Sequence, residues 1–129
     1  MNRYERAAQI WPVLTLCATN RQVLTYDILG KLVGVPRQGL GQLLEPIQSH
    51  CIKANSPALT SLVVSDKSGL PGEGFIAAAD VPAEQASVFR FAWLDSAPPG
   101  PDELKVAAKE FPSNGHSLAE LKEKARLAR

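Results

Sequence analysis

A few side chains in this sequence are of types that act as nucleophiles, general bases or metal ligands. They are Cys17, His50, Cys51, Ser61 and His116. The two cysteines form no CxxC pair, neither histidine has metal-ligand spacing to a partner, and Ser61 lacks the glycine-flanked turn of a hydrolase nucleophile. We therefore predict structural, reduced cysteines, surface histidines, a serine within a strand, no metal or other cofactor, and no enzymatic activity.

A second group of side chains suits the recognition of nucleic acid. Arg37 has the donors to bind a guanine edge or a phosphate, and glutamine pairs well with adenine. A Thr-Tyr pair at the start of a predicted helix is placed to donate hydrogen bonds to phosphate oxygens. The candidate DNA-binding residues are Arg21, Thr25, Tyr26, Arg37, Gln38 and Gln42.

The elements that would position these residues begin with a helix over residues 3–19. Apolar side chains recur there at helical spacing: Tyr4, Ala7, Ala8, Trp11, Leu14 and Ala18, with Leu16 and Cys17 widening the stripe. Pro12 interrupts this pattern, because a proline inside a helix removes a backbone hydrogen bond. The helix is therefore expected to kink at Pro12 or to start near it.

Two further helices are predicted across a tight turn. Thr25 is a suitable N-cap for a helix over residues 26–33, and Gly34 is suited to end it. Pro36 fits the first turn of a recognition helix over residues 36–50, within which Pro46 predicts a bend or an end. The outward face of this helix would carry Arg37, Gln38, Gln42, Glu45 and Gln48.

From residue 59 on, the sequence pattern predicts strands and a turn. Residues 59–64 have β-branched content typical of a strand, residues 66–69 form a turn, and residues 75–78 form a second strand, which together predict a hairpin. Asp80 caps a helix over residues 82–94, whose apolar stripe would be Ala86, Phe89, Trp93 and Leu94. Val88 and Phe91 lie off this stripe and would mark a protein interface if exposed.

The C-terminal part follows a proline-rich linker at residues 97–101. A short helix is expected over residues 102–111. A last helix begins at Ser117, which forms a capping box with Glu120. We therefore divide the chain into a domain over residues 1–96 and an extension over residues 97–129, made of the linker and helices.

The order of these elements is that of an α+β winged helix-turn-helix, with a three-helix core, a β-hairpin wing and additional C-terminal helices. In such a fold a short helix braces a second helix in the major groove, while the wing reaches the backbone or the minor groove. The charge is less typical of a DNA-binding protein, because the net charge is only +1. Residues 1–56 are mildly basic, with six Lys and Arg against three acidic residues, and residues 57–101 are acidic, with two against five.

Residues 23–36, followed by Gly39-Leu40-Gly41-Gln42-Leu43-Leu44, resemble the winged-helix domain of alkylguanine DNA alkyltransferases and alkyltransferase-like proteins. That family opens this region with a Thr-Tyr pair, continues with a Gly-x-Pro turn and then a helix containing Arg-x-x-Gly. The resemblance covers about residues 20–78, including Leu62-Val63-Val64-Ser65 and Gly69. It implies a winged-helix fold and a phosphate-side role for Tyr26.

The active-site motif of that family is absent. Its Pro-Cys-His-Arg-Val sequence falls on Leu59-Thr60-Ser61-Leu62-Val63, so the nucleophile, the histidine and the arginine are all missing. The arginine that fills the gap left by a flipped base falls on Gln38, with Arg37 adjacent. This alignment excludes alkyl transfer and puts base flipping in doubt.

Two functions remain open from the sequence. One is a non-enzymatic, DNA-binding or DNA-associated protein whose partner is double-stranded DNA. The other is an adaptor that binds a protein through the 70–75 loop or the C-terminal helix. We expect no membrane association and a cytoplasmic location, because the chain has no long uncharged apolar run and the segment from Ala7 to Ala18 lacks the features of a secretion signal.

Overall fold

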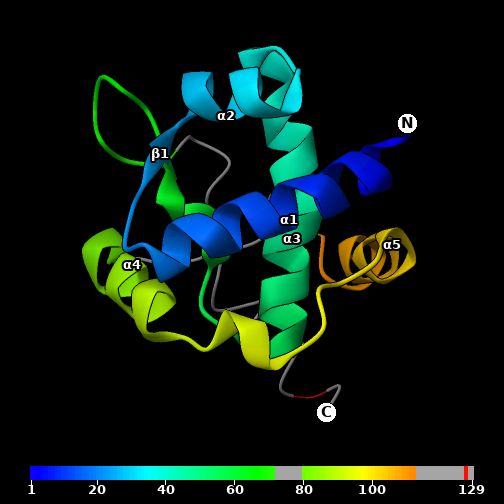
Figure 1. Ribbon diagram of the computed structural model, residues 1–129. Coiled ribbons are helices and arrows are strands. Elements are labelled where there is room, and N and C mark those ends of the chain that lie inside the picture. Colours follow the sequence, from blue (N-terminus) through cyan, green and yellow to red (C-terminus); the bar gives the residue numbers. More distant parts are fainter. Residues whose placement is uncertain (72–79, 113–126, 128–129) are drawn as a thin grey trace.

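The computed structural model describes residues 1–71, 80–112 and 127, and it is mainly helical with a small parallel sheet (Figure 1). Its helices and strands are α1 (Arg3–Thr19), β1 (Leu24–Thr25), α2 (Tyr26–Val33), α3 (Leu40–Ala54), β2 (Val63–Val64), α4 (Val81–Arg90) and α5 (Pro101–Glu110). Short 3₁₀ helices are η1 (Arg37–Gly39), η2 (Leu59–Leu62) and η3 (Trp93–Asp95). The predicted α+β class is confirmed. The predicted strand over residues 75–78 and the helix from Ser117 lie outside the described residues.

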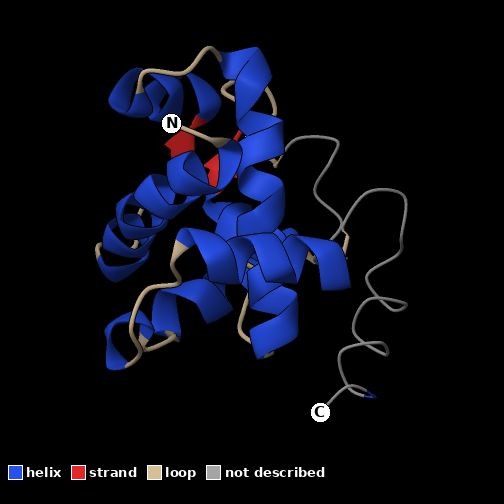
Figure 2. Cartoon of the chain, turned by 90° about the vertical axis from the view of Figure 1, so that its right-hand side faces the viewer, coloured by secondary structure: helices blue, strands red, loops and turns tan. Residues whose placement is uncertain are grey.

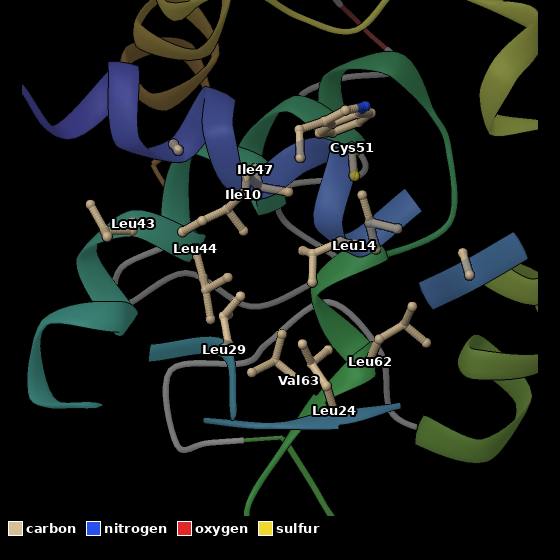
Figure 3. Packing of buried hydrophobic residues seen from close by; sticks show 14 of the residues in the cluster. Ile10, Leu14, Leu24, Leu29, Leu43, Leu44, Ile47, Cys51, Leu62 and Val63 are labelled. Carbon is tan, nitrogen blue, oxygen red and sulfur yellow. The ribbon is translucent and has the colours of Figure 1, made fainter. Parts of the chain in front are cut away.

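The core forms where α1 crosses α3. Ile10 and Leu14 of α1 are fully buried against a cluster that includes Leu44 and Ile47 of α3 (Figure 3). Burying an aliphatic side chain of this size contributes roughly 1.5–3 kcal/mol. The helix predicted over residues 102–111 is α5, and its Leu104 joins the same cluster. It packs against both α1 and α3.

Both internal prolines lie within uninterrupted helices. α1 runs through Pro12 and α3 runs through Pro46, so α1 does not start near Pro12 and α3 does not end at Pro46, which are each one of the two outcomes that the sequence suggested. Fully buried side chains flank both positions, including Ile10 and Leu14 around Pro12. Tertiary packing of an amphipathic face supplies most helix stability in proteins, and here it outweighs one lost backbone bond.

α2 and the start of α3 are joined by the turn that the sequence predicted. The Thr25 side chain accepts a hydrogen bond from the Ile28 amide, and Gly34 ends α2 in the left-handed conformation at φ 74°. Both caps are confirmed. Gly30 of α2 approaches this turn so closely that an added Cβ would lie 2.6 Å from the backbone oxygen of Val35. Only glycine permits this approach.

The strand prediction over residues 59–64 is wrong for its first four residues. Residues 59–62 form η2, and only Val63 and Val64 are extended. β2 pairs in parallel with β1, with Leu24 opposite Val63, a pairing that the sequence did not predict. The two strands lie next to α2 (Figure 2). The turn predicted at residues 66–69 is present, and the Gly69 amide donates to the Ser65 carbonyl at 2.8 Å.

Three predictions about apolar side chains also fail. The helix expected to reach residue 94 ends at Arg90, because the chain becomes extended at Phe91, and Leu94 is 81% exposed. Val88, expected off the core stripe, is fully buried, whereas Leu16, expected in the stripe of α1, is exposed. Trp93 is buried as predicted, although it belongs to η3.

The close approach at Gly30 gives a test of the helix-turn-helix packing. We expect Gly30→Ala to lower the free energy of unfolding by about 1–3 kcal/mol, because the new methyl group meets backbone atoms that cannot yield locally. Gly41→Ala is the matched control, since nothing lies within 4 Å of its added Cβ. That variant should be unchanged or more stable by up to about 1 kcal/mol. Urea denaturation of both variants measures the difference, and equal stability of the two would contradict the close approach.

Candidate nucleic-acid interface

The start of α2 and the start of the η1–α3 unit bring several predicted DNA-binding residues together. Tyr26 is the first residue of α2, and the Arg37 guanidinium carbon lies 5.8 Å from the centre of its ring. Thr25 precedes Tyr26 and has its side chain engaged as the N-cap. The amide-rich N-terminus of α2 and two side chains that suit phosphate therefore share one end of the molecule, at the top of Figure 1.

Arg37 also lies between two carboxylates. Its Nη1 atom is 3.7 Å from an oxygen of Asp27 in α2 and 3.7 Å from an oxygen of Asp66 in the turn after β2. All three side chains are about half exposed. Sequence reasoning missed this arrangement, because Asp66 is far from Arg37 along the chain and reads only as a turn residue.

An open groove runs beside Arg37. Two of its lining side chains are basic, Lys31 and Arg37, and one is acidic, Asp27; the glycines and the turn between the helices complete it. Its lining residues are Asp27, Gly30, Lys31, Gly34, Val35, Pro36 and Arg37. Lys31 is exposed, and no ion pair to it is seen among the described residues.

The outward face of the recognition segment differs from the prediction in one position. Gln38 in η1 and Gln42 in α3 are exposed as expected, but Gln48 is buried and so cannot face a ligand. α3 packs against α1, η2 and α5, and its exposed residues lie in its first turn, at Gly41 and Gln42, and at its C-terminal end, at Lys53 and Ala54. Arg37 and Gln38 lie in the 3₁₀ turn before α3, not in the α-helix itself.

Glu45, which would repel DNA, is paired within the protein. Arg3 of α1 donates to a Glu45 carboxylate oxygen at 2.8 Å and to the backbone oxygen of Gln42 at 2.6 Å. Arg6, also in α1, donates to the Val33 carbonyl at the end of α2 at 2.9 Å. These two arginines therefore fasten α1 to α2 and α3, and Arg3 neutralises an acid on the candidate face.

Arg21 is separated from the other candidates. It lies in the turn after α1, at the opposite end of β1 from Tyr26, and no described contact joins it to Arg37. Its side chain is exposed and its φ of 56° is in the left-handed region. That conformation costs a non-glycine residue about 1–2 kcal/mol. A glycine at this position would avoid that cost, but the chain has an arginine there.

Four of the five residues of possible catalytic chemistry are buried or half-buried, and the fifth, His116, lies outside the described residues. Burial raises the pKa of the Cys51 thiol to about 11, and burial also raises that of Cys17. His50 is half-buried, not on the surface as predicted, and its ring meets Trp11 edge-on at 5.4 Å. Burial lowers the pKa of His50, against an opposing effect of Glu103. Among the described residues, no three acidic, histidine or cysteine side chains are grouped to hold a metal ion.

η2 occupies the position onto which the alkyltransferase motif falls. The Thr60 and Ser61 side chains are buried, and among the described residues no hydrogen-bond partner is seen for their hydroxyl oxygens. The segment is held by α4 instead: Glu84 accepts from the Ala58 amide at 2.6 Å, and Gln85 donates to the Ser61 carbonyl at 2.8 Å. Ser61 is thus closed off in a 3₁₀ helix, where the sequence suggested a strand.

Comparison of the chain with protein-family models, curated proteins and solved structures finds no match. Within the described residues, no helix is both long enough and apolar enough to cross a membrane.

Two buried serines give a matched test of the packing around η2. Ser61→Ala should leave the free energy of unfolding unchanged or raise it by roughly 1 kcal/mol, because an unpaired hydroxyl is costly to bury. Ser49→Ala should lower it by about 1–2 kcal/mol, because the Ser49 hydroxyl donates to the Phe111 carbonyl at 2.7 Å. Chemical denaturation distinguishes them. Equal losses in both variants would mean that the Ser61 hydroxyl is hydrogen-bonded.

The reactivity of the two cysteine thiols tests the prediction that neither acts as a nucleophile. With its pKa raised to about 11, Cys51 is protonated at pH 8, and its burial shields it from reagents. We expect a thiol-reactive aromatic disulfide to leave Cys51 unlabelled in the native protein and to label both cysteines after denaturation. Peptide mass analysis separates the two sites. Rapid labelling of Cys51 in the native state would overturn this assignment.

Proposed function

We propose that this protein binds duplex DNA without catalysing a reaction, through a winged helix-turn-helix whose reading unit is α2, η1 and the start of α3. The order α1, β1, α2, turn, α3 and β2 supports this fold. In the proposed complex, the first turns of α3 enter the major groove and the turn after β2 begins the wing.

The observation that carries the proposal is the placement of Arg37 over Tyr26 at adjoining helix starts. One end of the molecule carries the N-termini of two helices together with an arginine and a tyrosine. These groups can bind a DNA phosphate that lies beside an accessible base edge. Gln38 and Gln42 are exposed on the following turns and are free to face bases. The internal pairing of Glu45 with Arg3 removes the main acidic obstacle on α3.

Binding should be weak and sensitive to salt. Phosphate contacts supply most of the affinity of DNA-binding proteins, and this face carries few cations. Lys31 and Arg37 are its exposed basic side chains, and the exposed Arg21 lies apart from them. A steep loss of affinity with rising salt distinguishes such an electrostatic complex from an apolar protein interface.

The test is a titration of a fluorescently labelled duplex at low salt with wild type and Arg37→Ala. Loss of Arg37 should weaken binding by on the order of 1–3 kcal/mol if it reads a base, or lower the salt dependence by about one counterion if it binds a phosphate. Tyr26→Phe and Gln38→Ala should weaken binding less, because each removes at most one hydrogen bond.

Arg90→Ala is the matched control for this titration. It removes the same charge from an exposed arginine of α4, in a part of the molecule away from α2 (Figure 1). Equal binding by wild type, Arg37→Ala and Arg90→Ala would show that Arg37 is not part of an interface. No binding by wild type at high micromolar concentration would reject the proposed function.

The second candidate is a protein-binding adaptor, and one observation favours it. Ile28 and Leu32 lie four residues apart on α2 with 50% and 64% of their surfaces exposed, so they form one apolar strip. The other surfaces suggested by the sequence, the 70–75 loop and the C-terminal helix, fall largely outside the described residues, although Leu70 is exposed. Ile28→Ser with Leu32→Ser should leave DNA binding intact under the first proposal.

A further inference from the structure

The two carboxylates around Arg37 come from different parts of the fold. Asp27 belongs to the first turn of α2, whereas Asp66 belongs to the turn that follows β2. The same nitrogen of Arg37 lies 3.7 Å from an oxygen of each. Arg37 therefore connects the helix-turn-helix to the turn at the base of the proposed wing, and it does so through half-exposed charges.

These ion pairs are of a kind that a ligand can replace. A separation of 3.7 Å exceeds the range of a direct charge-assisted hydrogen bond. Exposed ion pairs of this type contribute little to stability. Arg3 offers the contrast, since it makes two short hydrogen bonds, one to Glu45 and one to the Gln42 carbonyl. Arg3 is fixed in the scaffold, whereas Arg37 is held loosely.

We propose that Asp27 and Asp66 compete with DNA for Arg37, and that duplex binding replaces the two carboxylates with a phosphate. This inference rests on the proposed function. In the free protein the aspartates keep Arg37 over Tyr26 and lower its attraction for anions. In the complex the guanidinium turns to the phosphate, and the link between α2 and the turn after β2 opens.

The competition has a signature that general charge repulsion lacks. Any acid near DNA repels phosphate, and neutralising it tightens binding whether or not an arginine is beside it. Competition for Arg37 disappears when Arg37 is absent. The gain from neutralising an aspartate must therefore depend on Arg37, and a double-mutant cycle measures this dependence.

The experiment is a duplex titration at low salt with wild type, Asp66→Asn, Arg37→Ala and the double variant. Asp66→Asn should tighten binding about 1.5- to 5-fold, the range expected for releasing one exposed ion pair. In the Arg37→Ala background the same change should give less than half of that gain. Asp66 is the better site than Asp27, because Asp27 also favours the N-terminus of α2 through its charge.

Asp95→Asn controls for net charge, because Asp95 is exposed in η3 at the other end of the molecule from α2 (Figure 1). A second readout is the Arg37 side-chain Nε signal in ¹H–¹⁵N spectra, which should shift when duplex is added and also when Asp66 is replaced in the free protein.

Two results would separate the possible failures. In the first, wild type binds through Arg37, but Asp66→Asn binds duplex no tighter than Asp95→Asn does, or it increases the affinity equally in the Arg37→Ala background. The competition is then wrong and the proposed function stands. If no protein of the series binds duplex, the proposed function is wrong and the competition falls with it.

Discussion

The close contact between Gly30 of α2 and the Val35 carbonyl sets the geometry on which the candidate interface depends. Because a Cβ at residue 30 would collide with that oxygen, only glycine allows α2 to pack directly on the turn before α3. Gly34 reverses the chain in the left-handed conformation, and Pro36 then leads into η1. A wider spacing would separate the start of α2 from the start of α3, and Arg37 would no longer lie over Tyr26.

Several basic residues of this fold make contacts within the protein. Arg3 and Arg6 are directed inward from α1, where they bind Glu45 and two backbone carbonyls, and Lys53 pairs with Glu110 of α5 at 3.1 Å. These cations connect helices, and the charges of Arg3 and Lys53 are each paired with an acid. On the candidate face, the exposed cations available to an anion are Arg37 and Lys31, and Arg21 lies apart from them. The candidate face therefore carries little positive charge, and any contact with nucleic acid depends on a few side chains.

Features set by neighbouring residues could be predicted, whereas features set by distant contacts could not. The Thr25 and Asp80 caps and the Gly34 turn are local, and the sequence predicted all three. The β-branched content of residues 59–64 predicted a strand, but the first four residues form η2, where Glu84 accepts from the Ala58 amide and Gln85 donates to the Ser61 carbonyl from more than twenty residues away. Gln48 was assigned to solvent from helical periodicity alone, which cannot show that α3 is covered on several sides. The pairing of Arg37 with Asp66 could not be predicted either, because the two residues are far apart in the sequence.

The arginines of this fold make two kinds of contact: one stabilises the packing of the helices, and the other involves the residue proposed to bind DNA. The bonds of Arg3 to Glu45 and of Arg6 to the Val33 carbonyl are short and partly buried, so breaking them costs stability. The contacts of Arg37 are long, exposed and shared between two acids, so exchanging them costs little. A side chain that must leave its resting partners to bind a ligand needs weak contacts at rest, on a backbone that does not move with it. Gly30 fixes that backbone, and the two aspartates provide those weak contacts.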